Sequence, residues 1–324
     1  MKKIDGHLHL VRAIAGFNGK GRLTPLGDGR AVWDDGTVIK LIPDGSGDDN
    51  FTAEAALDIM AKSDVEKAVV LQGSLNGYQN YYTYQAIKKY PDKFIGAFSV
   101  DPFSEFYMDI VKRYIEDLGF RAMKFEISQG GGMHGYHYDT PFRLDTNPRI
   151  GRIMHFISDY PGFVITVDYG NFEQFSYQPE AIANLAKMYP NIDFVVCHLS
   201  FPNADHPDRL RTALAQWQPY ANIYTDISAI QDIEGETDFP FPRCQEDVKI
   251  AKEMLGAERI IWGTDSPWSA TFNDYNELAT WLESTDIFTE EEYADVMYNN
   301  ALRIYFKPTA IAAIAHANDS AMQD

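Results

Sequence analysis

The chain has 324 residues, a length that permits one large domain or two of ordinary size. Hydrophobic residues make up 45% of it and charged residues 23%, a globular composition that excludes a disordered or fibrous chain. It carries 28 lysines and arginines against 47 aspartates and glutamates, so its formal net charge is −19. A surface of that sign repels phosphate backbones and anionic lipid, and we therefore expect neither nucleic acid nor a membrane as a partner.

Cysteine content and the amino-terminal residues bear on where the protein acts. The two cysteines, Cys197 and Cys244, are too few for a disulfide scaffold. The first residues lack the apolar run of a signal peptide, and no apolar run reaches membrane-spanning length. We expect a soluble, cytoplasmic protein, and a homodimer is compatible with these features.

Short apolar runs alternate with amphipathic stretches along the chain. The runs typical of strands cover residues 3–10, 67–72, 94–100, 120–126, 163–168, 193–198, 222–226 and 259–264. The stretches typical of helices cover residues 52–63, 78–90, 105–118, 148–160, 179–189, 207–217, 245–255, 273–284 and 289–305. This alternation predicts one α/β domain over residues 1–306, a (β/α)8 TIM barrel. An open doubly wound sheet alternates in the same way, but no Gly-x-Gly-x-x-Gly turn follows the first strand.

Two long loops and a tail interrupt the regular strand–helix units. Residues 11–50 are rich in glycine and polar residues, and a loop of that length at the carboxyl end of a barrel strand is typical of a lid or a substrate wall. The same holds for residues 128–143. Residues 307–324 are alanine-rich and polar, and we expect this tail to fray.

The strongest chemical signal is the pair of histidines in Asp5-Gly6-His7-Leu8-His9 on the first predicted strand. Side chains two apart on a strand project from the same face, so both imidazoles would lie in the barrel interior. Two buried imidazoles side by side are typical of a divalent metal site. The alternative is a pair of core histidines hydrogen-bonded to carboxylates.

Two further polar residues end apolar strands at the same mouth of the barrel. Asp265 follows the run that begins at Ile260, where active sites of barrels form, although an aspartate before Pro267 is also common as a turn residue. His198 ends another strand and is suited to act as an acid, a base or a carbonyl polariser. Its neighbour Cys197 would alternate to the other face and pack against a helix.

These motifs together resemble the metal-dependent hydrolases and decarboxylases of the amidohydrolase superfamily, over essentially the whole folded chain. The motifs that carry the resemblance are Asp5-x-His7-x-His9, Gly119-Phe120-Arg121-Ala122-Met123-Lys124, His198-Leu199, Gly263-Thr264-Asp265-Ser266-Pro267 and Asn300-Ala301-Leu302-Arg303-Ile304-Tyr305. The resemblance implies that His7 and His9 bind metal and that Asp265 both binds metal and moves protons. It implies that His198 acts on the substrate.

One position departs from the family pattern. Asp168 stands where relatives carry a metal-binding histidine at the end of strand five. A carboxylate there is compatible with zinc or manganese and shifts preference toward harder ions, so we count Asp168 among the metal ligands. We expect one divalent ion, zinc or manganese. The alternative is a site that has lost its metal, as in some lactone-hydrolysing relatives.

Residues on the substrate side carry weaker signals. Lys124 and Glu126 share one face of a strand, and a buried lysine there can pair with Glu126 or Asp168, hold a substrate carboxylate, or be carbamylated between two metals. We expect Lys124, Glu126, Tyr78 and Arg143 to contact substrate. His134 and His137 lie in a glycine-rich loop and are left out of the metal set.

The predicted function is hydrolysis of a small lactone, ester or amide of the sugar-acid or aromatic-acid type by a metal-activated water. Asp265 would take the proton of the water while His198 polarises the carbonyl oxygen. The alternative is non-oxidative decarboxylation of a hydroxylated aromatic acid with the same metal shell. A non-catalytic binding protein is disfavoured by His198 and Asp265. The expected partner is a small-molecule substrate.

Overall fold

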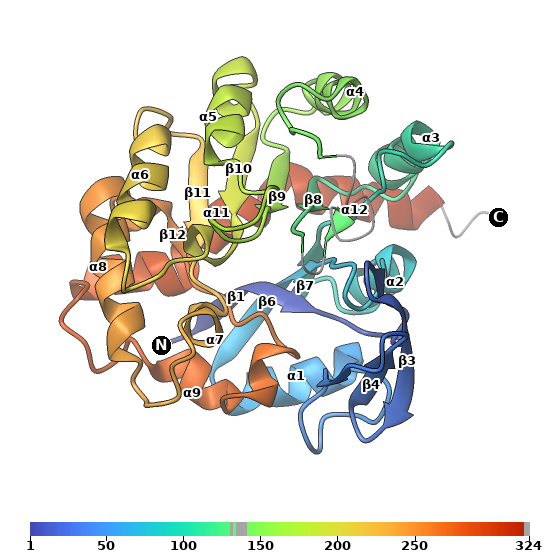
Figure 1. Cartoon of the computed structure of the whole chain (residues 1–324). Helices are drawn as coiled ribbons and strands as arrows, with labels where there is room; N and C mark the ends of the chain where they lie inside the picture. The colour runs from blue at the N-terminus through green and yellow to red at the C-terminus, as the bar shows by residue number, and fades with distance from the viewer. Residues whose placement is uncertain (130–131, 134–140, 321–324) are drawn as a thin grey trace.

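Eight parallel strands form the centre of the computed structural model, which describes residues 1–129, 132–133 and 141–320 (Figure 1). These strands are β1 (Lys3–His9), β6 (Val65–Leu71), β7 (Phe94–Gly96), β8 (Ala122–Glu126), β9 (Val164–Asp168), β10 (Asp193–Val196), β11 (Ile223–Asp226) and β12 (Ile260–Ile261). Each lies within or overlaps one of the predicted runs. They pair as β1-β6-β7 and β8-β9-β10-β11-β12.

Parallel bridges join the two sheets at both seams. Phe98, just after β7, pairs with Met123 of β8, and Leu8 of β1 pairs with Ser266 beyond β12. At the second seam the His9 amide donates to the Ser266 carbonyl at 2.7 Å. The strands therefore follow one another in chain order around a ring, and the prediction of a (β/α)8 barrel is confirmed.

Helices lie around the outside of the strands (Figure 1). They are α1 (Ala53–Lys62), α2 (Asn80–Lys89), α3 (Tyr107–Lys112), α4 (Pro148–Ile157), α5 (Pro179–Met188), α6 (Pro207–Trp217), α7 (Ile230–Ile233), α8 (Pro242–Leu255), α9 (Tyr275–Thr280), α10 (Glu290–Ala294), α11 (Asn300–Tyr305) and α12 (Pro308–Ser320). Local sequence fixes several starts: the Asn147 side chain accepts the amide of Ile150 at the start of α4, with Pro148 in the first turn. No helix in the described ranges is long and apolar enough to cross a membrane.

The long segment between β1 and α1 is folded and not an open loop. It forms an antiparallel sheet in the order β2 (Phe17–Asn18), β3 (Gly21–Gly27), β4 (Arg30–Trp33) and β5 (Val38–Lys40). Asp28 and Gly29, both at positive φ, connect β3 to β4, the conformation that a two-residue hairpin turn requires. Leu23 and Trp33 are buried beneath this sheet.

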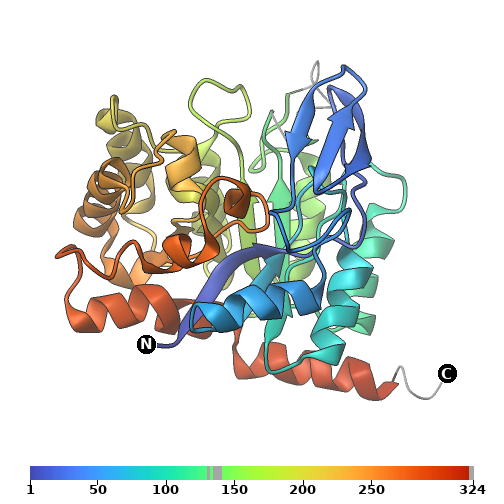
Figure 2. The ribbon, with the colours of Figure 1, turned by 90° about the horizontal axis from the view of Figure 1, so that it is seen from below.

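The carboxyl-terminal segment also differs from the expected fraying tail. Residues 308–320 form α12, which buries Ala310 and Ile314. The helix lies so close to Gly119 that a Cβ there would come within 2.4 Å of the Ala313 carbonyl oxygen. Since Gly119 precedes β8, α12 covers the amino-terminal end of the barrel. Figure 2 shows α12 and the small β2–β5 sheet at opposite ends of the molecule.

Candidate active site

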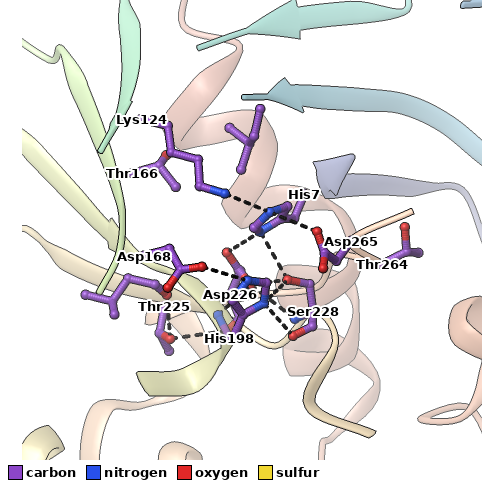
Figure 3. Close-up of polar contacts among 12 residues, drawn as sticks. His7, Lys124, Thr166, Asp168, His198, Thr225, Asp226, Ser228, Thr264 and Asp265 are labelled. Atoms are coloured by element: carbon purple, nitrogen blue, oxygen red, sulfur yellow. Dashed lines mark hydrogen bonds and ion pairs between the residues drawn. The ribbon is translucent and has the colours of Figure 1, made fainter. Parts of the chain in front are cut away.

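Four predicted site residues converge at the carboxyl ends of the strands. His7 and His9 belong to β1, His198 follows β10, and Asp265 follows β12. Oδ1 of Asp265 lies 2.9 Å from Nε2 of His9 and 3.4 Å from Nε2 of His7. The His198 ring stacks on the His7 ring with centroids 4.8 Å apart (Figure 3). The sequence motifs therefore describe one site.

Asp5 holds the two histidines against the segment that carries Asp265. Its Oδ1 accepts the amides of His7 at 3.1 Å and Thr264 at 3.0 Å, and its Oδ2 accepts the Thr264 hydroxyl at 2.6 Å. Gly6 permits this approach, because a Cβ there would lie 2.8 Å from the Trp262 carbonyl oxygen. Burial raises the pKa of Asp5 to about 6, against the opposing effect of these hydrogen bonds. Asp5 is therefore a positioning residue.

The Nδ1 atoms of the two β1 imidazoles contact outer partners, so both Nε2 atoms face Asp265. Nδ1 of His9 lies 3.0 Å from the Leu71 carbonyl oxygen, and because that oxygen can only accept, the proton is on Nδ1. Nδ1 of His7 lies 3.0 Å from Oδ2 of Asp226, which places its proton there as well. Burial lowers the pKa of His7 to about 4, so this imidazole is neutral at pH 7. Nε2 of His7 thus keeps a lone pair, while Nε2 of His9 is hydrogen-bonded to Oδ1 of Asp265 at 2.9 Å.

These atoms form a donor set suited to a divalent ion. The ligand atoms of His7, His9 and Asp265 all lie within 4.8 Å of one another. Two imidazole nitrogens and a carboxylate oxygen are common ligands of zinc and of manganese. The carboxylate of Asp226 behind His7 is the kind of outer partner that orients a metal-binding histidine. The residues present therefore fit one divalent ion.

Cys197 lies inside the barrel, which corrects the prediction that it packs against a helix. Its sulfur lies within 4.8 Å of ring nitrogens of His7 and His198. The reason is a left-handed turn: His198, Leu199, Ser200 and Phe201 all have φ between 49° and 61°, so strand alternation ends before them. Such a turn costs about 1–2 kcal/mol per residue outside glycine. Burial raises the pKa of the Cys197 thiol well above its usual value, which makes it a poor metal ligand.

Asp226 was recognised in the sequence only as a strand end, yet it anchors this turn. Its Oδ1 accepts the His198 amide at 3.0 Å, while its Oδ2 binds Nδ1 of His7. Nδ1 of His198 donates to the Ser228 carbonyl oxygen at 2.9 Å. Although burial acts to raise it, contacts with His7 and His198 hold the pKa of Asp226 well below its usual range.

The opposite side of the site contains paired charges. Glu126 of β8 and Asp168 of β9 are register partners on adjacent strands. Nζ of Lys124 lies 3.0 Å from Oε2 of Glu126 and 3.5 Å from Nε2 of His7. Nε2 of His198 lies 3.6 Å from Oδ2 of Asp168. The side chains of Lys124 and His198 are only 2% and 6% exposed, so both ion pairs are screened little by water.

The pKa values follow from this pairing. Burial opposes the charge of Lys124, but Glu126 and the other carboxylates raise its pKa above the usual value. Burial and the Asp168 charge raise the pKa of Glu126 to about 7. Although burial lowers it, the contact with Asp168 and the nearby carboxylates of Asp265 and Asp226 raise the pKa of His198 to about 10. His198 is therefore an imidazolium at neutral pH, while the pKa of Asp168 is lowered, chiefly by His198 against the effect of burial.

A cavity of about 220 Å³ opens beside these groups. The residues that line it are His9, Gly73, Ser74, Leu75, Asn76, Lys124, Glu126, Ser128, Asp168, Gly170, Gln174, His198, Phe201, Ala229, Asp232, Ile233, Asp265 and Trp268. Sequence reasoning missed Asp232 and Trp268, whose Nε1 donates to Oδ2 of Asp232 at 2.9 Å. The available signal was position: Trp268 stands three residues after Asp265, and Asp232 six residues after the end of β11.

Some predicted residues lie outside the cluster of ligand atoms or outside the cavity. Asp168 lines the cavity but is absent from the cluster of His7, His9 and Asp265, and it faces His198. Arg143 does not line the cavity, because its guanidinium binds Asp145 at 2.9 and 2.8 Å. Tyr78 does not line it either. His134 and His137 lie outside the described residues.

The 11–50 segment does not line the cavity with any of its described residues, but it packs behind the cavity wall. A Cβ on Gly16 would lie 2.0 Å from the Leu75 carbonyl oxygen, and the Ala15 amide donates to the Asn76 carbonyl at 3.2 Å. Leu75 and Asn76 belong to the lining. The segment thus fixes the loop after β6 that forms this wall.

A family model described as Amidohydrolase matches residues 4–307, and the chain belongs to this family. Among curated proteins it is similar to an L-fucono-1,5-lactonase of Burkholderia ambifaria, with 24% identity over 107 residues. That match covers 32% of this chain and only 36% of the length of the relative.

Solved structures with the same fold include hydrolases and decarboxylases. A probable 2-pyrone-4,6-dicarboxylic acid hydrolase of Acinetobacter baumannii, solved with citric acid, has 16% identity and a TM-score of 0.66 over 95% of this chain and 100% of that one. An amidohydrolase of Burkholderia multivorans with bound zinc has 14% identity and a TM-score of 0.67, with the same coverage. A 2,6-dihydroxybenzoate decarboxylase from Rhizobium has 16% identity and a TM-score of 0.55 over 77% of this chain and 86% of that one. Identities this low establish the shared fold alone.

Proposed function

We propose that this enzyme hydrolyses a small lactone with the help of one divalent ion, zinc or manganese, held by His7, His9 and Asp265. The main support is the convergence of these three ligand atoms within 4.8 Å, with the ring tautomers fixed by Leu71 and Asp226. A divalent ion at such a site supplies a water of lowered pKa and polarises a bound carbonyl.

Asp265 is suited to handle the proton of the attacking water. The contacts with both imidazoles are made by its Oδ1, which leaves Oδ2 to accept that proton and to pass it to the departing alcohol oxygen. Asp265 lines the cavity and its side chain is 13% exposed, so substrate can reach it. The water oxygen bonds to the lactone carbonyl carbon, and the proton that it loses resides on Asp265. That proton ends on the ring oxygen when the lactone C–O bond breaks.

His198 is suited to stabilise the negative charge that develops on the carbonyl oxygen. Its position over the cavity and its raised pKa make it a charged donor, and the left-handed turn and Ser228 fix its orientation. We assign Asp168 to the support of this imidazolium and leave it outside the metal shell. Lys124 and a bound ion would compete for the lone pair on Nε2 of His7. The ion pair with Glu126 would keep the Lys124 ammonium partnered when the ion takes that lone pair.

A small ring is compatible with the cavity volume of about 220 Å³. The names of two similar proteins, an L-fucono-1,5-lactonase and a 2-pyrone-4,6-dicarboxylic acid hydrolase, describe ring-opening hydrolases and support a lactone as substrate. Decarboxylation of a hydroxybenzoate is the competing reaction.

The test compares purified enzyme on a panel of lactones and on dihydroxybenzoates, following acid release in a pH-stat and carbon dioxide by infrared detection. We expect acid release from lactones, loss of that activity in chelator, and recovery with zinc or manganese. Carbon dioxide from the benzoates without lactone hydrolysis would show a decarboxylase. Full lactonase activity in metal-free protein would remove the ion from the mechanism.

A further inference from the structure

Carboxylates outnumber cations in the described lining of the cavity. Four carboxylates, Glu126, Asp168, Asp232 and Asp265, face it against two cations, Lys124 and the His198 imidazolium, and no arginine is among the lining residues. Both cations already face a carboxylate, Lys124 that of Glu126 at 3.0 Å and His198 that of Asp168 at 3.6 Å. Residues 130–140, which are only partly described, contain no lysine or arginine in the sequence. The described lining therefore offers no arginine and no unpaired cation to bind a substrate carboxylate.

Asp232 is the acid of this set that neither the metal cluster nor the paired charges use. It lies on α7, the short helix after β11, and the charges of Asp265 and His198 act on it. Trp268 Nε1 donates to its Oδ2, and among the described residues no hydrogen bond to its Oδ1 is present. One oxygen is thus anchored, while the other remains an acceptor at the cavity wall.

Trp268 adds an apolar surface next to this acceptor. Its indole ring lines the cavity and is fixed at one edge by Asp232 and at another by Phe272, whose ring lies 5.2 Å away in a T-shaped contact. An ionised carboxylate accepts strong hydrogen bonds from hydroxyl groups, and a fixed aromatic ring packs against the carbon skeleton of a ring substrate. A second carboxylate placed beside Asp232 would meet like charge at short range.

We propose that Asp232, held by Trp268, determines substrate specificity. It accepts a hydrogen bond from a hydroxyl group of a neutral lactone and repels a carboxylate on the same ring. This inference rests on the proposed lactone hydrolysis and narrows its substrate class. It assigns Asp232 to recognition and not to bond breaking.

The test uses pairs of hexono-1,4-lactones and hexaro-1,4-lactones that differ only in a hydroxymethyl group or a carboxylate at C6. We expect wild-type enzyme to prefer the neutral member in kcat/KM, and Asp232→Asn to reduce that preference roughly tenfold, because the isosteric amide keeps an acceptor oxygen but loses the charge. Asp238→Asn removes the same charge from an exposed position of the neighbouring loop and is expected to leave the preference unchanged.

Binding of the corresponding lactams, measured by calorimetry, separates recognition from hydrolysis. A wild-type preference for the carboxylated member, or equal preferences in wild type and Asp232→Asn, would overturn the role of Asp232. Absence of lactone hydrolysis combined with a neutral preference in lactam binding that Asp232→Asn loses would overturn the proposed reaction and leave the recognition role standing. If Asp232→Asn fails to fold by circular dichroism, Asp232→Ser carries the same comparison.

Discussion

The active site has two sides that handle charge differently. The histidine side, formed by His7, His9 and Asp265, brings the Nε2 atoms of two imidazoles to one carboxylate oxygen, while their Nδ1 atoms contact outer partners. The paired side, formed by Lys124, Glu126, Asp168 and His198, contains two cations that each face a carboxylate. The same residue types thus serve two purposes: one side offers ligand atoms, while the other holds fixed charges.

The difference originates in the outer partners of each group. On the histidine side, a backbone carbonyl of Leu71 and the carboxylate of Asp226 keep the protons on Nδ1. On the paired side, the ends of β8 and β9 place Glu126 and Asp168 next to each other, and the buried cations compensate them. Losing a ligand and losing a charge partner should therefore have distinct consequences.

The largest effect is expected from His7→Ala. Removing one of three ligand atoms should abolish metal binding and lower kcat/KM on the order of 10³-fold or more. Elemental analysis and steady-state kinetics measure both. His155→Ala, which changes an exposed histidine of α4, serves as the control and should retain wild-type metal content and rate. A His7→Ala enzyme with full metal content would contradict the assignment.

The next largest effect is expected from Lys124→Met, which should lower the free energy of unfolding. It leaves Glu126 buried without its cation, and breaking a buried pair in this way costs about 3–5 kcal/mol in the free energy of unfolding. Urea unfolding measures this, and the double variant Lys124→Met/Glu126→Gln should recover much of the loss. Lys89→Met breaks an exposed pair with Glu54 and should cost no more than about 1 kcal/mol. Equal losses of unfolding free energy at the two lysines would show that the buried pair contributes no more than an exposed one.

Asp226→Asn should weaken the histidine side without removing a ligand. An amide no longer fixes the proton on Nδ1 of His7, and losses of this kind lower metal affinity roughly 10–100-fold. Titration of zinc into the metal-free variant measures the change, with Asp208→Asn on the exposed face of α6 as the matched control. Unchanged zinc affinity would mean that the His7 tautomer does not depend on Asp226.

The smallest effects are expected from substitutions of Asp168, which test whether this residue belongs to the paired side or to the metal ligands. If it supports His198, Asp168→Asn should keep the metal content of wild type and lower kcat roughly tenfold. Asp168→His should likewise leave zinc affinity unchanged. A rise in zinc affinity in Asp168→His, together with metal loss in Asp168→Asn, would place Asp168 in the metal shell as the sequence predicts.

Much of this could be predicted from sequence because the signals are local. Strand periodicity located all eight strands, and the spacing of His7 and His9 alone fixes their common direction. His198 and Asp265 were found because each directly ends an apolar run. Such signals need no knowledge of what lies opposite in the barrel.

The errors share a different origin, since they depend on contacts between distant segments. Cys197 was misplaced because four consecutive left-handed residues interrupt strand alternation, and the Asp226 contacts that hold them lie 28 residues away. The place of Asp232 in the site follows from its hydrogen bond with Trp268, which joins two segments that are distant in the sequence. Arg143 is the exception, because its partner Asp145 lies two residues away and a local ion pair was readable from the sequence.

The most direct test of the metal assignment is a crystal structure of the zinc-loaded enzyme with anomalous data at the zinc edge. We expect one anomalous peak at about 2.0–2.2 Å from Nε2 of His7, Nε2 of His9 and a carboxylate oxygen of Asp265, with Asp168 still facing His198. A peak bound by Asp168 or Cys197, or no peak among the three ligands in active protein, would contradict it.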